Sequence, residues 1–229
     1  MNIPSGPAPE IDQAALARQV YARLVDYFGE PTWRMALSPL DELVSTILSQ
    51  NTNDRNRDQA YESLRARFPT WELVRDAEPD QVVAAIRSAG LANQKGPRIQ
   101  TILCQITAER GSLDLDFLRQ LPSDEAQAWL LRFNGVGPKT AAIVLQFSLG
   151  KPAFPVDTHI YRVSGRLALR PIGMTVEQAH LHLAGLFLPE TYGTAHLNLI
   201  RLGREICQAR RPNCPSCPLM DICAYYKNL

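Results

Sequence analysis

The chain of 229 residues is 45% hydrophobic and 21% charged, with a formal net charge of +1. It can therefore bury a substantial core, and disorder is not the expectation. No stretch approaches the roughly 20 apolar residues needed to cross a bilayer, so a chain built around membrane-spanning helices is excluded. The first ten residues hold three prolines, a glycine and a serine but neither a basic start nor an apolar run. We expect a flexible tail at 1–10, no signal or transit peptide, and a soluble cytoplasmic protein.

The charge is divided unevenly along the chain. Residues 1–130 hold 13 Lys and Arg against 18 Asp and Glu, a net of −5, whereas residues 131–229 hold 11 against 5, a net of +6. The basic half is where an anionic polymer would bind. An ordinary charge fluctuation in a globular protein explains the difference equally well, so the imbalance decides nothing alone.

Apolar residues recur at helical spacing along almost the whole chain. Alternating strand patterns are scarce, apart from a short extended piece at 153–156. The pattern predicts an all-α fold of about ten helices. One representative helical series is Leu16, Val20, Leu24 and Phe28.

Several residues indicate where these helices begin and end. Asp54 and Thr175 are good candidates for N-caps. A glycine at Gly150, followed by two prolines, predicts a boundary near residue 150 because glycine ends a helix and proline prevents it from resuming. Helix ends are predicted at Gly29, Gly90 and Gly150.

Five cysteines are present, and their distribution is informative. Cys104 stands alone in an apolar helical pattern and is most simply a small core residue. The other four lie within the last 23 residues. Without a secretion signal, four thiols so close together indicate a metal centre rather than disulfides. These four are Cys207, Cys214, Cys217 and Cys223.

The spacing of these four cysteines is C-x6-C-x2-C-x5-C. Zinc ribbons usually present two close pairs, whereas only the middle pair is close here. Four thiolates fit a [4Fe-4S] cluster. We therefore expect an iron-sulfur cluster, with zinc as the alternative.

The segment 131–142 contains the densest chemistry. Gly135 and Gly137 flank Val136 and let the backbone turn tightly with its amide groups open, and Pro138 suits the first position of a new helix. A turn of this kind, followed by a helix N-terminus, can hold a phosphate. Ordinary turns between helices also use glycine, so the turn alone is not specific.

Lys139 would lie in the first turn of that helix, where the helix dipole disfavours the ammonium form, as a nucleophilic lysine requires. Asp157 can cap the next helix. A helix over 138–148 would be roughly 16 Å long, and the residues after it suffice to bring the chain back to its start. Asp157 can then face Lys139 as its base. A solvent-facing lysine and an aspartate that only caps a helix stay open as alternatives.

Taken together, these pieces resemble the endonuclease III family, a branch of the helix-hairpin-helix DNA glycosylases. The resemblance spans about residues 37–226 and is carried, in the family's order, by 47–54, 90–95, 135–141, 156–163 and the cysteine tail, whose spacing is the family's cluster signature. Departures are Phe133-Asn134 in place of Leu-Pro, Pro138 in place of Arg, and Asn51 in place of Gln.

The resemblance implies a two-lobed all-α fold. Its parts would be the tail at 1–10, an N-terminal helix at 11–33 that packs on the cluster lobe, a six-helix barrel with the helix-hairpin-helix at 34–150, and a [4Fe-4S] cluster domain at 151–229.

The resemblance also implies an activity on double-stranded DNA that contains a damaged base or an abasic site. Lys139 would attack C1′ of the damaged nucleotide, Asp157 would activate it, and β-elimination through a Schiff base would cut the strand. The protein would be a nucleoid-associated monomer, with Leu91 and either Gln50 or Asn51 filling the gap left by the extruded base. The DNA-binding residues would be Gln50, Asn51, Leu91, Gly135, Val136, Gly137, Thr140, His159, Arg210 and Arg211.

Other readings remain. An adenine-removing mismatch glycosylase is disfavoured because Thr46 stands where that group has its catalytic Glu, and because that group lacks the hairpin lysine. A thymine-mismatch or pyrimidine-dimer glycosylase of the same fold stays open. A non-catalytic DNA-binding module gives no reason for the spacing of Lys139 and Asp157, and an iron-sulfur electron carrier needs no phosphate-holding hairpin.

Overall fold

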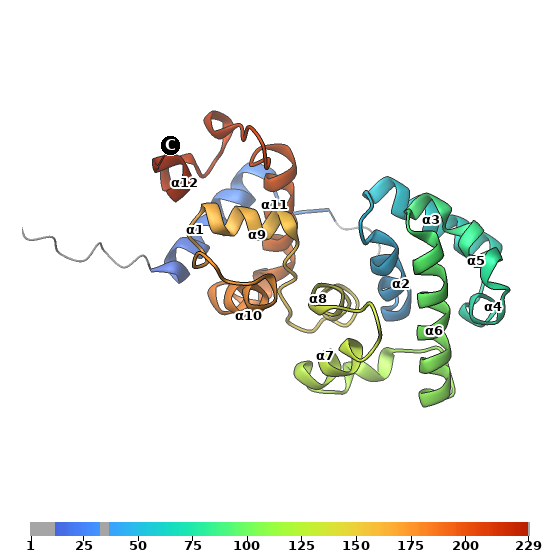
Figure 1. The fold of residues 1–229 in the computed structure, drawn as a ribbon. Helices are drawn as coiled ribbons and strands as arrows, with labels where there is room; N and C mark the ends of the chain where they lie inside the picture. The colour runs from blue at the N-terminus through green and yellow to red at the C-terminus, as the bar shows by residue number, and fades with distance from the viewer. Residues whose placement is uncertain (1–11, 33–36, 229) are drawn as a thin grey trace, which may run out of the picture. The chain divides into compact units, whose positions relative to one another are not determined.

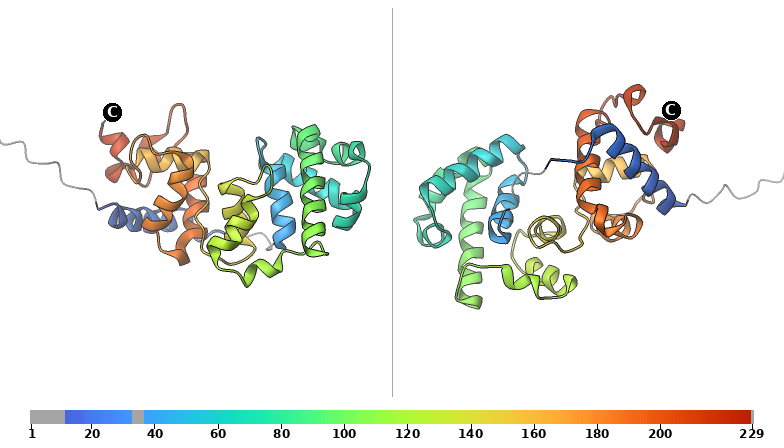
Figure 2. Two further views of the ribbon diagram at one scale, coloured as in Figure 1. Left: turned by 60° about the horizontal axis from the view of Figure 1, so that its bottom comes forward. Right: turned by 180° about the vertical axis from the view of Figure 1, so that it is seen from behind.

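The computed structural model describes residues 12–32 and 37–228, so the predicted tail at 1–10 lies outside the described residues. Within these ranges the chain consists of helices joined by loops (Figure 1, Figure 2), with no β-strand. The all-α prediction is confirmed, and the extended piece at 153–156 joins no sheet. Among the described residues no helix has the length and apolar character to cross a membrane.

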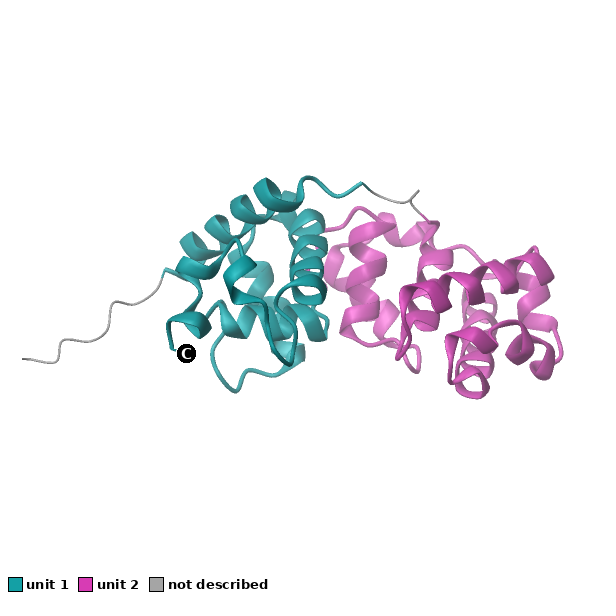
Figure 3. Ribbon diagram, turned by 90° about the horizontal axis from the view of Figure 1, so that it is seen from above, with its two compact units in different colours: residues 1–32, 156–229 teal, residues 33–155 magenta. Residues whose placement is uncertain are grey.

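The chain divides into two compact units (Figure 3), which we call the terminal unit (residues 1–32 and 156–229) and the central unit (residues 33–155). The terminal unit contains α1 (Gln13–Phe28), α9 (Thr158–Arg166), α10 (Val176–Leu186), α11 (Tyr192–Glu205) and α12 (Ala224–Lys227). The central unit contains α2 (Pro39–Ser49), α3 (Asp54–Arg67), α4 (Trp71–Asp76), α5 (Pro79–Ala85), α6 (Ala92–Arg110), α7 (Ser123–Leu131) and α8 (Pro138–Phe147).

Short 3-10 helices lie in the connections. In the central unit these are η1 (Arg87–Ala89) and η2 (Asp116–Arg119). In the terminal unit they are η3 (Pro189–Thr191), η4 (Cys214–Ser216) and η5 (Met220–Ile222).

The long helix α6 organises the central unit, where it packs against α2, α4 and α5, while α8 packs against α2 and α7. The buried apolar residues of α6 recur at i, i+3, i+4 and i+7, a spacing that places them on one face of the helix. Cys104 falls on the opposite face and is exposed, so the prediction that it is a core residue is wrong. At about 100° per residue, one step beyond Leu103 already turns the side chain outward. The buried stripe comprises Ile99, Ile102, Leu103 and Ile106.

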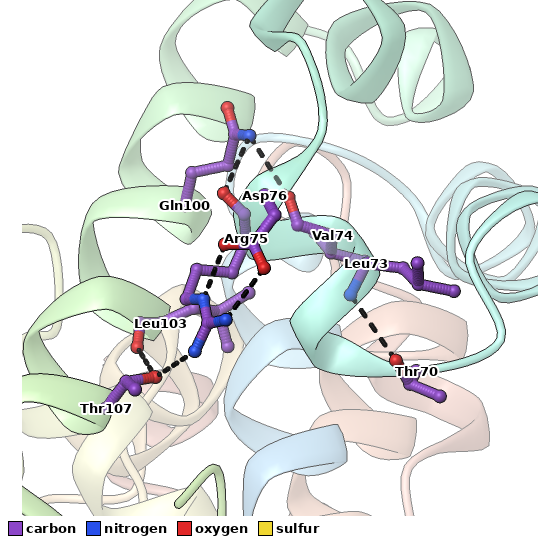
Figure 4. A network of polar contacts seen from close by, with 8 residues as sticks. All are labelled: Thr70, Leu73, Val74, Arg75, Asp76, Gln100, Leu103 and Thr107. Atoms are coloured by element: carbon purple, nitrogen blue, oxygen red, sulfur yellow. Dashed lines mark hydrogen bonds and ion pairs between the residues drawn. The ribbon is translucent and has the colours of Figure 1, made fainter. Parts of the chain in front are cut away.

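Polar side chains join α4 to α6 (Figure 4). Gln100 is 9% exposed, and its amide donates a hydrogen bond to the carbonyl oxygen of Val74 at 3.0 Å. The same amide donates to the carbonyl oxygen of Ala77 at 2.8 Å. Arg75 reaches Thr107 Oγ1 at 3.0 Å. A side chain of α6 thus provides donors for carbonyl groups at the C-terminal end of α4, which have no partner within the helix.

In the terminal unit, α1 packs against α10 and α11. Its buried face is Ala17, Val20 and Leu24. Asn198 of α11 is 2% exposed and donates to the carbonyl oxygen of Gly29, where α1 ends, at 3.2 Å. A chain segment from the N-terminus is therefore built into the same core as the C-terminal helices.

Most predicted helix ends hold. Thr175 caps α10 and forms a reciprocal capping box with Gln178, and Gly29 ends α1 at φ +77°. Gly90 ends η1 at φ +64°. Asp54 is not an N-cap, because Asn53 takes that place with its side chain accepting from the Asn56 amide at 2.9 Å. Asp54 is the first helical residue, where its negative charge suits the helix dipole.

Candidate active site and cysteine centre

A tight turn joins α7 to α8 in the central unit. Gly135 has φ +84°, a conformation that favours glycine, while Gly137 caps α8 in an extended conformation. The Val136 side chain is 5% exposed and anchors the turn in the core. Pro138 is the first residue of α8, as predicted. The result is a helix N-terminus presented by a rigid turn, which is a ready anion site.

Lys139 is the second residue of α8, and its side chain is exposed. Thr140 follows it and is only 4% exposed. The first-turn amides of a helix have no intrahelical acceptor. The predicted nucleophile therefore stands beside amides that can bind a phosphate.

Arg98 of α6 packs directly on this turn. A Cβ added at Gly135 would lie 2.4 Å from Arg98 Cδ. Arg98 Nη1 donates to Gln50 Oε1 at 3.2 Å, and Gln50 Nε2 donates to the Gly135 carbonyl oxygen at 2.9 Å. The side chain of Gln50 is thus engaged at both ends within the central unit.

This close packing predicts a difference between the two glycines of the turn. Gly135→Ala should lower the free energy of unfolding by about 1–3 kcal/mol, because alanine is strained at positive φ and Arg98 must move. Gly137→Ala is the matched control, since nothing lies within 4 Å of the added Cβ and φ is negative, and it should cost less than about 1 kcal/mol. Urea unfolding of both variants measures this difference, and equal losses would contradict it.

The two predicted gap-filling positions share an unusual backbone. Asn51 (φ +53°) and Leu91 (φ +49°) are in the left-handed conformation, which non-glycine residues seldom adopt. Asn51 is exposed, and Leu91 is 48% exposed despite its apolar side chain. Both follow directly on a helix end, after α2 and η1 respectively.

Lys95 lies beneath these two segments and is only 1% exposed. Its ammonium donates to the carbonyl oxygens of Leu48 and Ala89, both at 2.8 Å. Burial, and secondarily the positive charge of Arg98, lowers the pKa of Lys95 below its usual range. Leu48 lies in the last turn of α2, where a cation is favoured by the helix dipole.

The other predicted catalytic residue, Asp157, lies in the terminal unit. It caps α9, and its carboxylate accepts a hydrogen bond from the Ile160 amide at 2.8 Å. His159 follows in the first turn, half-buried, with Nδ1 at 3.2 Å from Arg162 Nη2 and its Cβ close to Gly203. The capping role that the sequence left open is therefore real, and it leaves the second carboxylate oxygen for other partners.

Two arginines of α9 hold the cysteine loop. Arg162 donates to the carbonyl oxygens of Gly203 (2.8 Å) and Cys207 (3.1 Å). Arg166 donates to Cys207 Sγ at 3.2 Å and to the Gln208 carbonyl oxygen at 2.7 Å. The helix that begins at the predicted catalytic aspartate thus also positions the first predicted cluster ligand.

All four C-terminal cysteines line one apolar cavity, together with Ile206, Pro212, Met220 and two tyrosines. Burial raises the pKa of the Cys217 thiol to about 11, and it raises the pKa of Cys214 as well. Such thiols are protonated at neutral pH unless a metal centre displaces the proton. Within the described residues no group of three or more His, Cys, Asp or Glu side chains is placed to hold a single metal ion.

Arg210 and Arg211 are exposed on the loop between the first two cysteines. Arg211 is in the left-handed conformation at φ +56°. Their exposure suits phosphate contact, and that role stays a prediction.

Sequence reasoning gave no role to Lys95, Arg98, Arg162 and Arg166. Lys95 was present as the last residue of the 90–95 segment, but burial of a lysine leaves no local signal. For the arginines of α9 the only signal is their i, i+4 spacing, which places both on one helix face.

Comparison with known proteins gives a consistent result. Residues 44–186 match the family model described as "HhH-GPD superfamily base excision DNA repair protein". The chain is similar to "Endonuclease III" of Thermotoga maritima, with 32% identity over 212 residues that cover 93% of this chain and 92% of the relative. A solved structure of a trapped endonuclease III–DNA covalent intermediate aligns with a TM-score of 0.81 and 27% identity, and covers 94% of this chain and 97% of that one.

Plant relatives are longer. The chain spans 50% of an Arabidopsis thaliana relative to which it is 42% identical over 146 residues. It spans 12% of the "DNA glycosylase/AP lyase ROS1" of the same plant, at 31% identity.

Proposed function

Because the chain belongs to the endonuclease III branch of the HhH-GPD superfamily of base excision DNA repair proteins, we propose that it is a bifunctional DNA glycosylase and abasic-site lyase. Its substrates are oxidised or otherwise damaged pyrimidines in double-stranded DNA, and it acts as a monomer. The observation that carries this proposal is the exposed Lys139 in the first turn of α8, directly after the anion-binding turn.

In this proposal the turn binds a DNA phosphate and thereby fixes the strand beside Lys139. The Lys139 amine attacks C1′ of the damaged nucleotide and the bond from C1′ to the base breaks, so that the base departs with its electron pair. Asp157 takes the proton from the amine. The sugar ring then opens, because the C1′–O4′ bond breaks and O4′ takes up a proton, and this leaves a protonated Schiff base between C1′ and the lysine nitrogen. The Schiff base makes the adjacent C2′ proton acidic. When that proton passes to water, the C3′–O bond breaks, the phosphate leaves and the strand is cut.

The four cysteines that line one cavity suit a [4Fe-4S] cluster, in which each thiolate binds a different iron. We propose that Cys207, Cys214, Cys217 and Cys223 hold this cluster. With all four irons bound by protein thiolates, the cluster would supply structural support and no open coordination site for substrate. The chain's own part is to position the ligands through Arg162 and Arg166 of α9.

The proposed activity is tested with duplexes that carry different damaged or mismatched bases. Base release and strand scission are scored separately, and borohydride is added to a duplex with an abasic site. We expect release of damaged pyrimidines, strand scission and a covalent adduct. Release of base without scission or adduct would indicate a monofunctional glycosylase, and binding without either reaction would indicate a non-catalytic DNA-binding protein. Preference for mispaired thymine would favour the alternative substrate class.

The cluster makes its own prediction. Protein purified without oxygen should be brown and contain about four iron and four sulfide per chain. Cys217→Ser should lose the colour and lower the melting temperature, because metal binding is coupled to folding. Cys104→Ser is the matched control, since Cys104 is exposed on α6, and it should keep both. A colourless wild-type protein that contains zinc instead would overturn the cluster assignment.

A further inference from the structure

Lys95 is a charged side chain in the interior of the central unit that the proposed reaction does not use. Desolvating an ammonium is costly unless it is hydrogen-bonded. Lys95 donates to the carbonyl oxygens of Leu48 and Ala89, which lie on separate segments of the chain. The side chain therefore joins two segments of the central unit that are distant in the sequence.

The two joined segments end in the two proposed gap-filling residues. Leu48 lies three residues before Asn51, and Ala89 lies two residues before Leu91. Both gap-filling residues have positive φ and exposed side chains. A left-handed backbone at a non-glycine residue persists where the surrounding structure holds it, and such strain gathers at functional positions.

One helical turn further along α6, Arg98 makes a second link. It binds Gln50, which in turn binds the Gly135 carbonyl oxygen, and its side chain fills the space where a Cβ at position 135 would lie. Gln50 is therefore occupied at both ends of its amide. Asn51, with its exposed side chain, is the polar residue available to enter DNA.

We propose that Lys95 and Arg98 are positioning residues that hold Asn51, Leu91 and the hairpin turn as one preformed unit, with Asn51 rather than Gln50 as the polar gap-filling residue. The inference rests on the proposed function. Extruding a nucleotide costs a few kcal/mol, and rigid insertion of side chains into the gap offsets that cost only if little ordering is needed on binding. Lys95 supplies that order in the free protein.

The test uses full-length Lys95→Met, which keeps side-chain length but removes the donors. The substrate is a duplex with a damaged pyrimidine and a neighbouring 2-aminopurine, whose fluorescence reports unstacking. We expect extrusion and base release to fall on the order of 10-fold to 10²-fold, as for other misplaced active-site groups. Trapping on a preformed abasic site should fall much less, because no base has to be extruded.

Gln100→Met is the matched control. Gln100 lies on the same helix and likewise binds carbonyl oxygens of a neighbouring segment, those of Val74 (Figure 4) and Ala77 at the end of α4. It should lower the melting temperature while leaving extrusion within about twofold of wild type. Parallel losses of extrusion in the Lys95 and Gln100 variants would mean that Lys95 serves stability alone, and would overturn the proposal.

A double-mutant cycle sharpens the result. Adding Lys95→Met to Leu91→Ala should reduce base release further by less than about threefold, because the residue to be positioned is already gone. Full additivity would contradict the proposal. Arg98→Met serves if Lys95→Met does not fold, since Arg98 is half-buried, and it should reduce extrusion in the same way. Normal extrusion in folded Arg98→Met would then contradict it.

The polar gap-filling residue is identified by comparing Asn51→Ala with Gln50→Ala, with Leu91 unchanged in both variants. We expect Asn51→Ala to lose extrusion on the same duplex with a damaged pyrimidine and a neighbouring 2-aminopurine. Gln50→Ala should also loosen the hairpin turn, which lowers its melting temperature. An inactive wild-type enzyme would refute the proposed function, whereas an active wild type with normal extrusion in Lys95→Met refutes only this inference.

Discussion

Lys139→Gln should abolish the borohydride-trapped adduct with abasic-site DNA and lower strand scission on the order of 10³-fold or more. The amide cannot form a Schiff base, so the step that precedes β-elimination is lost. Because the Lys139 side chain is exposed, its replacement leaves the core of the central unit unchanged and the melting temperature should stay near that of wild type. The adduct is measured on denaturing gels.

Lys151→Gln provides the control for Lys139→Gln. Lys151 lies beyond the end of α8 and donates to the Leu121 carbonyl oxygen, so it should keep wild-type trapping even though it removes the same charge. An adduct that persists in Lys139→Gln and disappears in another lysine variant would show that the nucleophile has been misassigned. Retained affinity for abasic-site DNA in Lys139→Gln would show that the loss is chemical.

Asp157→Asn should lower turnover by on the order of 10²-fold to 10⁴-fold, the range that a general acid or base contributes. Asparagine caps a helix about as well as aspartate, so the hydrogen bond from the Ile160 amide and the stability of α9 should be kept. The measurement is single-turnover base release, with DNA affinity determined in parallel. A variant that binds DNA normally yet turns over slowly identifies the carboxylate charge as the missing element.

Asp12→Asn is the matched variant for Asp157→Asn, since Asp12 caps α1 in the same terminal unit by accepting from the Ala15 amide at 3.0 Å. It makes the same chemical change at another helix N-terminus and should leave turnover within about twofold of wild type. If Asp157→Asn is equally active, the proposed catalytic role of Asp157 is wrong and only the cap remains.

Much of the local structure follows from short-range physics. Pro138 at the first position of α8, the capping box of Thr175 and the glycine end of α1 are set by the backbone preferences of single residues. The all-α class follows from apolar periodicity alone. These features need no knowledge of the rest of the chain.

Features that change when a helix is shifted by one residue are harder to predict from the sequence. Asn53 and Asp54 are both good caps, and only the folded chain selects Asn53. Cys104 directly follows the buried Leu103 in the sequence but lies on the outer face of α6. In both cases tertiary contacts decide between choices that differ locally by little free energy.

For the site, the hairpin residues and the four cysteines carry local signals, and the structure gives the turn the geometry of an anion site. The residues that support the hairpin turn and the cysteines carry no such local signal. The hydrogen-bond partners of Lys95 come from segments 47 and 6 residues away, and Arg162 reaches a carbonyl 45 residues distant. Such contacts are products of the tertiary fold, so no motif marks them.

Helix α9 has a consequence for damage to the protein itself. Asp157 caps its N-terminus, and nine residues later Arg166 donates a hydrogen bond to Cys207 Sγ. A helix of roughly 13 Å therefore connects the proposed catalytic carboxylate to the first cysteine of the cluster loop. If an oxidant destroyed the thiolate centre, the C-terminal end of α9 would lose the contact between Arg166 and Cys207. The helix could then shift and move the Asp157 carboxylate at its N-terminal end. Oxidation of the cysteines is therefore expected to lower turnover before the protein unfolds.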